Sequence, residues 1–177
     1  MVWELTPEEL LIRYDYGERD FRGIKLIESE RDINGEQVTL RGADLREINL
    51  RGSYLREVDL TEANLTGADL SGICLESAVL KRAIIKDACL HSANLHWCIF
   101  DEADLTGTVL NHMNACSAFF RNVKIGPFEY AVLADANFNG AMTPNQLLCR
   151  GGNLIWDTVM PDGSIVAGPQ FGDGKGR

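Results

Sequence analysis

The feature that most constrains this chain is a large apolar residue at every fifth position. The series starts at Leu40 and continues in steps of five to Ile125, interrupted by the small residue Ala115. A helix with about 3.6 residues per turn would scatter these side chains around its circumference. A flat strand would send successive members to opposite faces. A chain that turns a corner every five residues brings each of them inward, so the spacing predicts a solenoid of stacked coils.

The positions around each apolar residue carry a second pattern. The residue two places earlier is mostly small, and the one between is often Asp or Asn. The two places that follow are mainly polar or glycine, residues that accept the backbone angles of tight corners. Backbone groups would then pair between coils stacked about 4.8 Å apart, as in any sheet.

These triplets closely resemble the pentapeptide-repeat family, whose pattern is A-(D/N)-L-x-x. The matching triplets are Ala43-Asp44-Leu45, Ala63-Asn64-Leu65, Ala68-Asp69-Leu70, Ala93-Asn94-Leu95 and Ala103-Asp104-Leu105. The resemblance implies an all-β solenoid, namely a right-handed quadrilateral β-helix with four pentapeptides and twenty residues per coil. It covers residues 38–143, and the run from Leu11 to Phe21 is similar to cyanobacterial members of the family.

Two interruptions divide the repeat. The step from Ile125 to Phe128 is three residues and contains Gly126-Pro127, which predicts an altered corner. A charged stretch near 27–37 is expected to form a loop extruded from an early coil.

Both ends carry helix-start signals, which we interpret as caps over the open ends of the solenoid. Thr6-Pro7-Glu8-Glu9 predicts a helix near 7–16, and Thr143-Pro144-Asn145-Gln146 predicts a second, short one. We therefore expect one domain over 1–177: a capping helix within 1–17, a β-helix over 18–143, a capping helix within 144–152 and an extension over 153–177. Around Pro161-Asp162-Gly163 the extension should hold two short extended runs, and its glycine-rich tail from Gly168 should be disordered.

Composition limits the possible partners. The chain has 17 basic and 26 acidic residues, a net charge of −9, which disfavours free nucleic acid. No apolar run approaches the about 18 residues of a membrane span, and the acidic N-terminal segment does not resemble a secretory signal, so a cytoplasmic location is expected. The five cysteines form no C-x-x-C pair and are expected to be reduced, partly buried thiols.

No catalytic, cofactor-binding or metal-binding motif is recognisable in the sequence. The family geometry would place His96 beneath Cys116, with His91 and His112 on neighbouring sides, and no fourth zinc ligand falls in place. The sequence therefore predicts no catalytic residues, no cofactor and no metal.

Family members that mimic DNA and bind type II topoisomerases suggest an alternative function. Such a mimic needs a continuous acidic face, yet residues 38–143 carry 13 acidic and 9 basic residues. Arg41, Arg46, Arg51 and Arg56 would ring one whole coil with positive charge.

The outward positions supply the candidate site. On one side these positions read Thr39, Asp59, Val79, Ile99 and Phe119, and the last three are apolar. Trp97 would lie at the adjoining corner, and Ile84 would open the next side. Exposed apolar patches mark binding surfaces, although such positions are also tolerated singly or covered by a chain's own tail. The sequence predicts a non-enzymatic structural or protein-interaction module, whose partner is an unidentified protein or a second copy of the chain.

Overall fold

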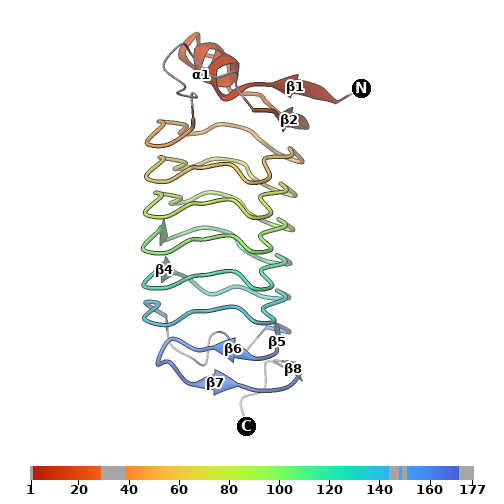
Figure 1. Ribbon diagram of the computed structural model, residues 1–177, viewed down its shortest axis with the longest axis vertical. Helices are drawn as coiled ribbons and strands as arrows, with labels where there is room; N and C mark the ends of the chain where they lie inside the picture. Colours follow the sequence, from red (N-terminus) through yellow and green to blue (C-terminus); the bar gives the residue numbers. More distant parts are fainter. Residues whose placement is uncertain (1, 29–38, 144–147, 149–150, 172–177) are drawn as a thin grey trace.

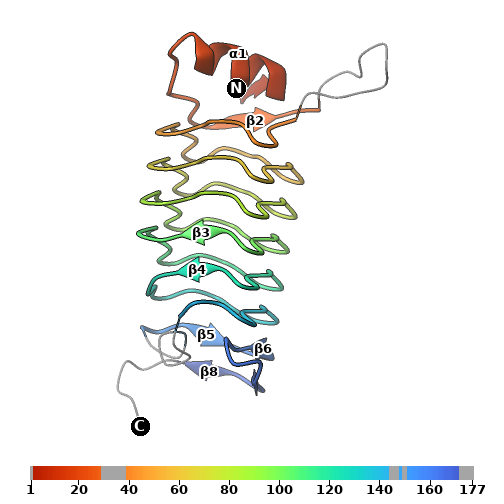
Figure 2. The same cartoon turned by 90° about the vertical axis from the view of Figure 1, so that its left-hand side faces the viewer.

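The computed structural model describes residues 2–28, 39–143, 148 and 151–171. Figure 1 shows a tall stack of coils with the N-terminal segment at one end and a group of short strands at the other. The turned view in Figure 2 shows β3 (Asp104–Leu105) directly above β4 (Lys124–Ile125), and these two strands pair in parallel.

The coils are joined by parallel bridges between residues 20 positions apart. Asp44 bridges Asn64, Asn49 bridges Asp69, Tyr54 bridges Cys74 and Asp59 bridges Val79. Each coil therefore has four bridged positions, one for each five-residue segment. The chain is a β-helix-type solenoid, and the stacking predicted from the five-residue spacing is confirmed.

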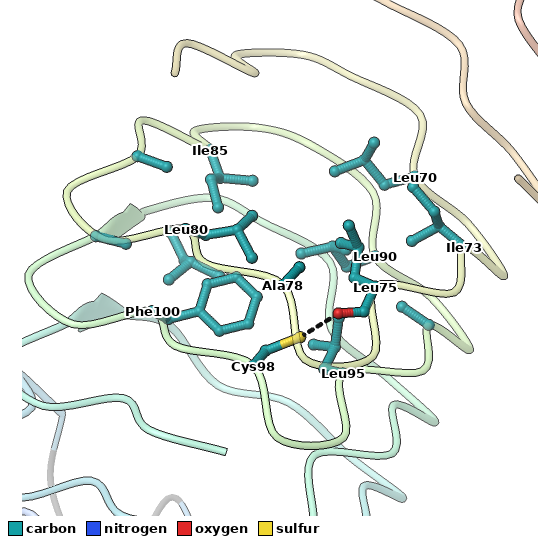
Figure 3. Close-up of a cluster of buried hydrophobic side chains, with 14 of the residues drawn as sticks. Leu70, Ile73, Leu75, Ala78, Leu80, Ile85, Leu90, Leu95, Cys98 and Phe100 are labelled. Atoms are coloured by element: carbon teal, nitrogen blue, oxygen red, sulfur yellow. Dashed lines mark hydrogen bonds between the residues drawn. The ribbon is translucent and has the colours of Figure 1, made fainter. Parts of the chain in front are cut away.

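The recurring apolar residues fill the interior of this solenoid. From Leu40 to Phe120 each of them is at most 2% exposed, and Ile125 is 6% exposed. Figure 3 shows part of this core, with side chains between Leu70 and Phe100 packed against one another. In this part the Cys98 thiol donates a hydrogen bond to the Leu75 carbonyl oxygen, at 2.8 Å. The small residues two places earlier are buried as well, except Ala43, which is partly buried at the first full coil. The inward and outward assignment made from the sequence is confirmed.

The Asp and Asn residues of the repeat have a local role in the corners. Their side-chain Oδ1 accepts a hydrogen bond from the backbone N–H two residues later, an Asx turn that stabilises the corner. Asn64 accepts from Thr66 at 3.1 Å, and Asp69 accepts from Ser71 at 3.0 Å. The same bond recurs at Asp20, Asp44, Asn49, Asp59, Asn94, Asp104, Asn114, Asn137 and Asp162.

The two breaks in the repeat appear as changes in bridge spacing. After Gly126-Pro127 the spacing falls from 20 to 18, as in the bridge from Asn114 to Val132, so the predicted altered corner is confirmed. Near the N-terminus Asp20 bridges Asn49, which is 29 positions away. The additional residues include the charged stretch near 27–37, most of which lies outside the described residues.

The N-terminal segment folds over the first coil. Helix α1 (Pro7–Asp15) begins with a complete capping box, because Thr6 and Glu9 each accept the other's backbone N–H. Leu10 and Tyr14 on this helix are buried, and Leu11 is partly buried against the core. Strand β1 (Trp3–Leu5), which pairs in parallel with β2 (Ile24–Leu26), was not predicted.

The C-terminal segment adds a last coil and a second layer beneath it. Strands β5 (Leu154–Ile155) and β6 (Thr158–Val159) continue the stack, and they pair antiparallel with β8 (Gln170–Phe171) and β7 (Ile165–Val166). The two short extended runs predicted around Pro161-Asp162-Gly163 are thus confirmed as β6 and β7, which form a hairpin. The prediction of disorder from Gly168 onward is wrong at Gln170 and Phe171, because the exposed edge of β5 supplies backbone hydrogen-bonding partners for them. Most of the predicted helix within 144–152 lies outside the described residues.

Candidate functional site

The predicted apolar residues lie one above another on a single side of the solenoid. Val79 bridges Ile99, and Ile99 bridges Phe119, in three consecutive coils. Val79 and Ile99 are half-buried by their neighbours in the ladder, whereas the Phe119 side chain is exposed. We call Val79, Ile99, Phe119 and the adjoining Trp97 the apolar stripe.

Trp97 is held at the corner beside this ladder. Its backbone has a φ of 57°, in the left-handed region that bulky residues rarely adopt, and its N–H donates to the Cys116 carbonyl at 3.1 Å. The side chain is 54% exposed, and its ring lies 4.3 Å from that of His96. The coil geometry therefore fixes a tryptophan at the surface, at a corner where the neighbouring coils place serine (Ser77 and Ser117).

The stripe lacks the hydrogen bonds that Asp and Asn supply elsewhere. Above it, Asp59 accepts from the Thr61 N–H at 2.9 Å; below it, Asn137 accepts from the Asn139 N–H at 3.0 Å. Val79, Ile99 and Phe119 have no side-chain acceptor, so three successive corners on this side lose the Asx turn. At the third corner Asp101 of the coil above accepts the Arg121 N–H instead, at 3.1 Å. Corner stability alone does not account for apolar residues at these positions.

One edge of the stripe is charged. The Arg121 guanidinium forms an ion pair with Asp101, and its carbon lies 5.4 Å from the centre of the Phe119 ring. Arg82 lies between two carboxylates, with Nε donating to Glu102 at 2.9 Å and Nη1 3.6 Å from Glu62. This edge therefore consists of compensated ion pairs next to an apolar ladder.

The apolar side extends further than the sequence predicted. Asn137 bridges Val159, and Val159 pairs with Ile165 of β7, whose side chain is 66% exposed. Trp156 lies at the last corner and is 49% exposed. These residues were missed because the bridge spacing rises to 22 in the last coil, so counting in steps of five no longer identifies the outward positions.

Ile84 lies on the neighbouring side, as predicted, because it bridges Asn64 and Asp104. Asp104 accepts hydrogen bonds from its neighbours on this side. Burial alone would raise the pKa of Asp104, but hydrogen bonds from Thr106, Lys124 and Lys86 outweigh it and lower the pKa to about 2.

The described residues contain no evident catalytic centre. No group of three or more His, Cys, Asp or Glu side chains among them is placed to hold a metal ion. The described cysteines are unpaired, and burial raises the pKa of the Cys98 thiol to about 12, which makes it a poor nucleophile. A cavity of about 260 Å³ lies where Pro7 and Leu26 meet the first coil at Leu40 and Val58. No helix in the described part of the chain is long and apolar enough to cross a bilayer.

Two sequence expectations about charge and histidine can be compared with the structure. Three arginines of the predicted ring form ion pairs with carboxylates: Arg41 with Asp59, Arg46 with Asp44 and Arg56 with Glu76. In each of these pairs a positive group lies next to a negative one, so the surface carries both signs of charge. His91 and His112, expected on sides next to that of His96, lie close together, with their ring centres 5.1 Å apart.

Comparisons with known proteins agree with this architecture. The family model described as "Pentapeptide repeats" matches residues 36–72, 59–96 and 88–122, with 8 copies. A search of curated proteins gives no match.

Solved structures with similarity to the chain include two pentapeptide repeat proteins and a resistance protein. One from the thylakoid lumen of Arabidopsis thaliana is 23% identical over 71% of this chain and 86% of its own, with a TM-score of 0.37. HetL, a protein involved in heterocyst differentiation regulation in Nostoc sp. strain PCC 7120, is 20% identical over 92% of this chain and 100% of its own, with a TM-score of 0.34. QnrB1, a plasmid-mediated fluoroquinolone resistance protein, is 13% identical over 72% of this chain and 75% of its own, with a TM-score of 0.28.

Proposed function

Because this chain belongs to the pentapeptide-repeat family, we propose that it is a non-enzymatic protein-interaction module and that the apolar stripe is its docking surface. The observation that carries this proposal is the ladder of Val79, Ile99 and Phe119, which replaces three successive Asx turns by apolar side chains. A contiguous group of accessible apolar residues that the local backbone does not require is typical of a binding surface.

The rigidity of the stripe supports docking with little loss of conformational entropy. Its backbone is held by hydrogen bonds to the coils on both sides, such as Ile99 N–H to the Ala78 carbonyl at 3.0 Å and Phe119 N–H to the Cys98 carbonyl at 2.9 Å. A surface that is already ordered avoids the cost of ordering on binding. The partner is a protein, either of another kind or a second copy of this chain, since symmetric homodimers are the commonest soluble assemblies.

The finer features of the architecture belong to the same proposal. The β-helix is right-handed with a square cross-section, the chain forms one domain over 1–177, and short helices cap both ends. The protein acts in the cytoplasm. Capped ends leave the sides of the solenoid as the available binding surface.

The alternative function is regulation of a type II topoisomerase by DNA mimicry. A mimic of DNA needs evenly repeated negative charge, whereas here carboxylates such as Asp44, Asp59 and Glu76 are paired with arginines. A supercoiling assay with purified gyrase distinguishes the two functions, because an interaction module without mimicry leaves supercoiling unchanged at micromolar protein.

The proposal is tested by changing the centre of the stripe and a matched position on another side. Val109 is also apolar, outward-facing and exposed, but it bridges Cys89 on a different side of the coil. We expect Ile99→Asn to abolish dimerisation in analytical ultracentrifugation, or capture of the wild-type partners, while Val109→Asn leaves both unchanged. Equal retention by both variants, or a wild-type protein that is monomeric and captures nothing, would contradict a docking role.

A further inference from the structure

Two of the three histidines meet at one corner of the solenoid, away from the apolar stripe. His91 follows Leu90 in one coil, and His112 lies two residues after Leu110 in the next. Both side chains are exposed. Their ring centres are 5.1 Å apart, and the ring planes are inclined by 75°. The two imidazoles are therefore held side by side at the surface.

The position of His112 is fixed by its neighbours. Its ring stacks on that of Tyr130, with centres 5.0 Å apart and planes within 10°. Tyr130 in turn lies over Gly152, where a Cβ atom would come within 2.8 Å of the tyrosine ring carbons. The His112 backbone N–H donates to the Glu129 carbonyl at 2.9 Å. This corner is thus packed from below, and a ligand can approach the histidines from solvent.

The backbone at His91 is fixed in the same way. Its carbonyl accepts a hydrogen bond from the Gly72 N–H at 2.8 Å, which ties it to the coil above. None of the hydrogen bonds among the described residues uses a ring nitrogen of His91 or His112. The nitrogen lone pairs of both rings are therefore available to an external ligand.

The separation of the rings fits two ligands of one metal ion. In zinc proteins the Zn–N distance is about 2.0–2.1 Å, which places an imidazole centre about 3.2 Å from the metal. Two such rings at a tetrahedral angle have centres about 5.2 Å apart. The observed 5.1 Å agrees with this value.

From this geometry we propose that His91 and His112 form a two-histidine site for a late first-row divalent transition metal ion such as Zn²⁺ or Ni²⁺. Imidazole nitrogen is a preferred ligand of these ions. The chain provides two ligands, and water completes the coordination. With fewer than the four ligands of a structural zinc site, the metal is exchangeable and is not needed for folding.

The test is metal titration of the full-length protein, with Zn²⁺ alone and then Ni²⁺ alone, by isothermal titration calorimetry. We expect one ion per chain and tighter binding of Ni²⁺ than of Zn²⁺. His91→Asn and His112→Asn should each weaken binding by roughly tenfold or more, because each leaves a single imidazole. The matched control is His96→Asn, which removes the remaining histidine and should leave binding unchanged.

The variants are chosen to keep the fold. His112 has a φ of 61°, and Asn is among the residues that tolerate this left-handed conformation. Far-ultraviolet circular dichroism checks each variant. For the wild-type protein, substoichiometric Cu²⁺ should broaden the NMR signals of the His91 and His112 rings together and leave those of His96 sharp.

Several outcomes would overturn the site. These are no Zn²⁺ or Ni²⁺ binding, binding that survives either His91→Asn or His112→Asn at full strength, and binding that is lost in His96→Asn. Any of these results would mean that the two rings form an aromatic contact only.

Discussion

Asp101 accepts hydrogen bonds from both the guanidinium and the backbone N–H of Arg121 in the next coil. The guanidinium Nε lies 3.1 Å from Oδ1 and 3.0 Å from Oδ2, Nη2 donates to Oδ2, and the backbone N–H donates to Oδ1 at 3.1 Å. The carboxylate side chain is 9% exposed and the guanidinium side chain 50%. The pair thus joins two coils beside the apolar stripe, with most of the burial on the acidic partner.

This asymmetry predicts unequal effects of the two single substitutions. Arg121→Met leaves a buried carboxylate without its counter-ion and should lower the free energy of unfolding by about 2–4 kcal/mol. Asp101→Asn leaves a half-exposed guanidinium that water can solvate, and should cost about 1–2 kcal/mol. Urea unfolding of the two variants and the double variant measures both values. Equal costs would mean that burial of Asp101 has no energetic consequence.

Truncating a core side chain should lower the free energy of unfolding much more than truncating its outward-facing neighbour. Leu70 is 1% exposed, so Leu70→Ala should cost about 2–5 kcal/mol. Ser71 faces outward, but its hydroxyl donates to Asp69 at 2.6 Å, so Ser71→Ala should cost only about 0.5–1 kcal/mol. Thermal unfolding followed by circular dichroism compares the two. A Ser71→Ala cost as large as that of Leu70→Ala would contradict the inward and outward assignment.

These core positions could be predicted from the sequence because each obeys the same spatial rule. A five-residue period places Leu70 or Leu95 inside whatever the remaining chain does. Strand β1 obeys no such rule, because three residues from Trp3 to Leu5 carry no periodic signal. Its structure depends on pairing with Ile24–Leu26, a contact that arises only once helix α1 has reversed the chain.

The candidate site likewise has one part that could be predicted from the sequence and one that could not. The stacking of Val79, Ile99 and Phe119 follows from a regular spacing of 20, so it was predictable. The extension to Ile165 depends on a bridge spacing that rises from 18 to 22 residues in the last coil, and on an antiparallel pairing. Neither feature has a repeat signal in the sequence. The contact between His91 and His112 depends on side-chain directions at a corner, where an offset of 21 positions brings the two rings together.

The helix cap provides a local test at the N-terminal end. Thr6→Ala removes the hydroxyl that accepts the Glu9 N–H at 3.2 Å and should lower the free energy of unfolding by about 1 kcal/mol. Thr6→Ser keeps the acceptor and should cost less than about half of that. Chemical denaturation of both variants checks the difference. If the two substitutions have the same effect, the hydroxyl does not stabilise the helix.

Stability should fall in acid because of Asp104. Its pKa is lowered from 3.8 to about 2 in the folded protein, so its contribution is complete above about pH 4. That contribution is lost as the pH falls from about 4 toward 2, because the carboxylate takes up a proton and releases Lys86 and Lys124. Asp104→Asn should be less stable than the wild type at pH 6, and the difference should shrink by pH 2. A difference that stays constant between these pH values would rule out this linkage.

The substitution that tests docking also makes a prediction about folding. Ile99→Asn places an amide at the position where Asp59 and Asn137, two coils away on either side, accept a backbone N–H, so it can restore the Asx turn to residue 101. The gained hydrogen bond should offset most of the lost contact with Val79 and Phe119, leaving the free energy of unfolding within about 1 kcal/mol of the wild type. Thermal unfolding checks this, with Val109→Asn as the control on another side. A loss of several kcal/mol at Ile99 alone would mean that the ladder holds the solenoid together, and that its apolar character serves packing and not a partner.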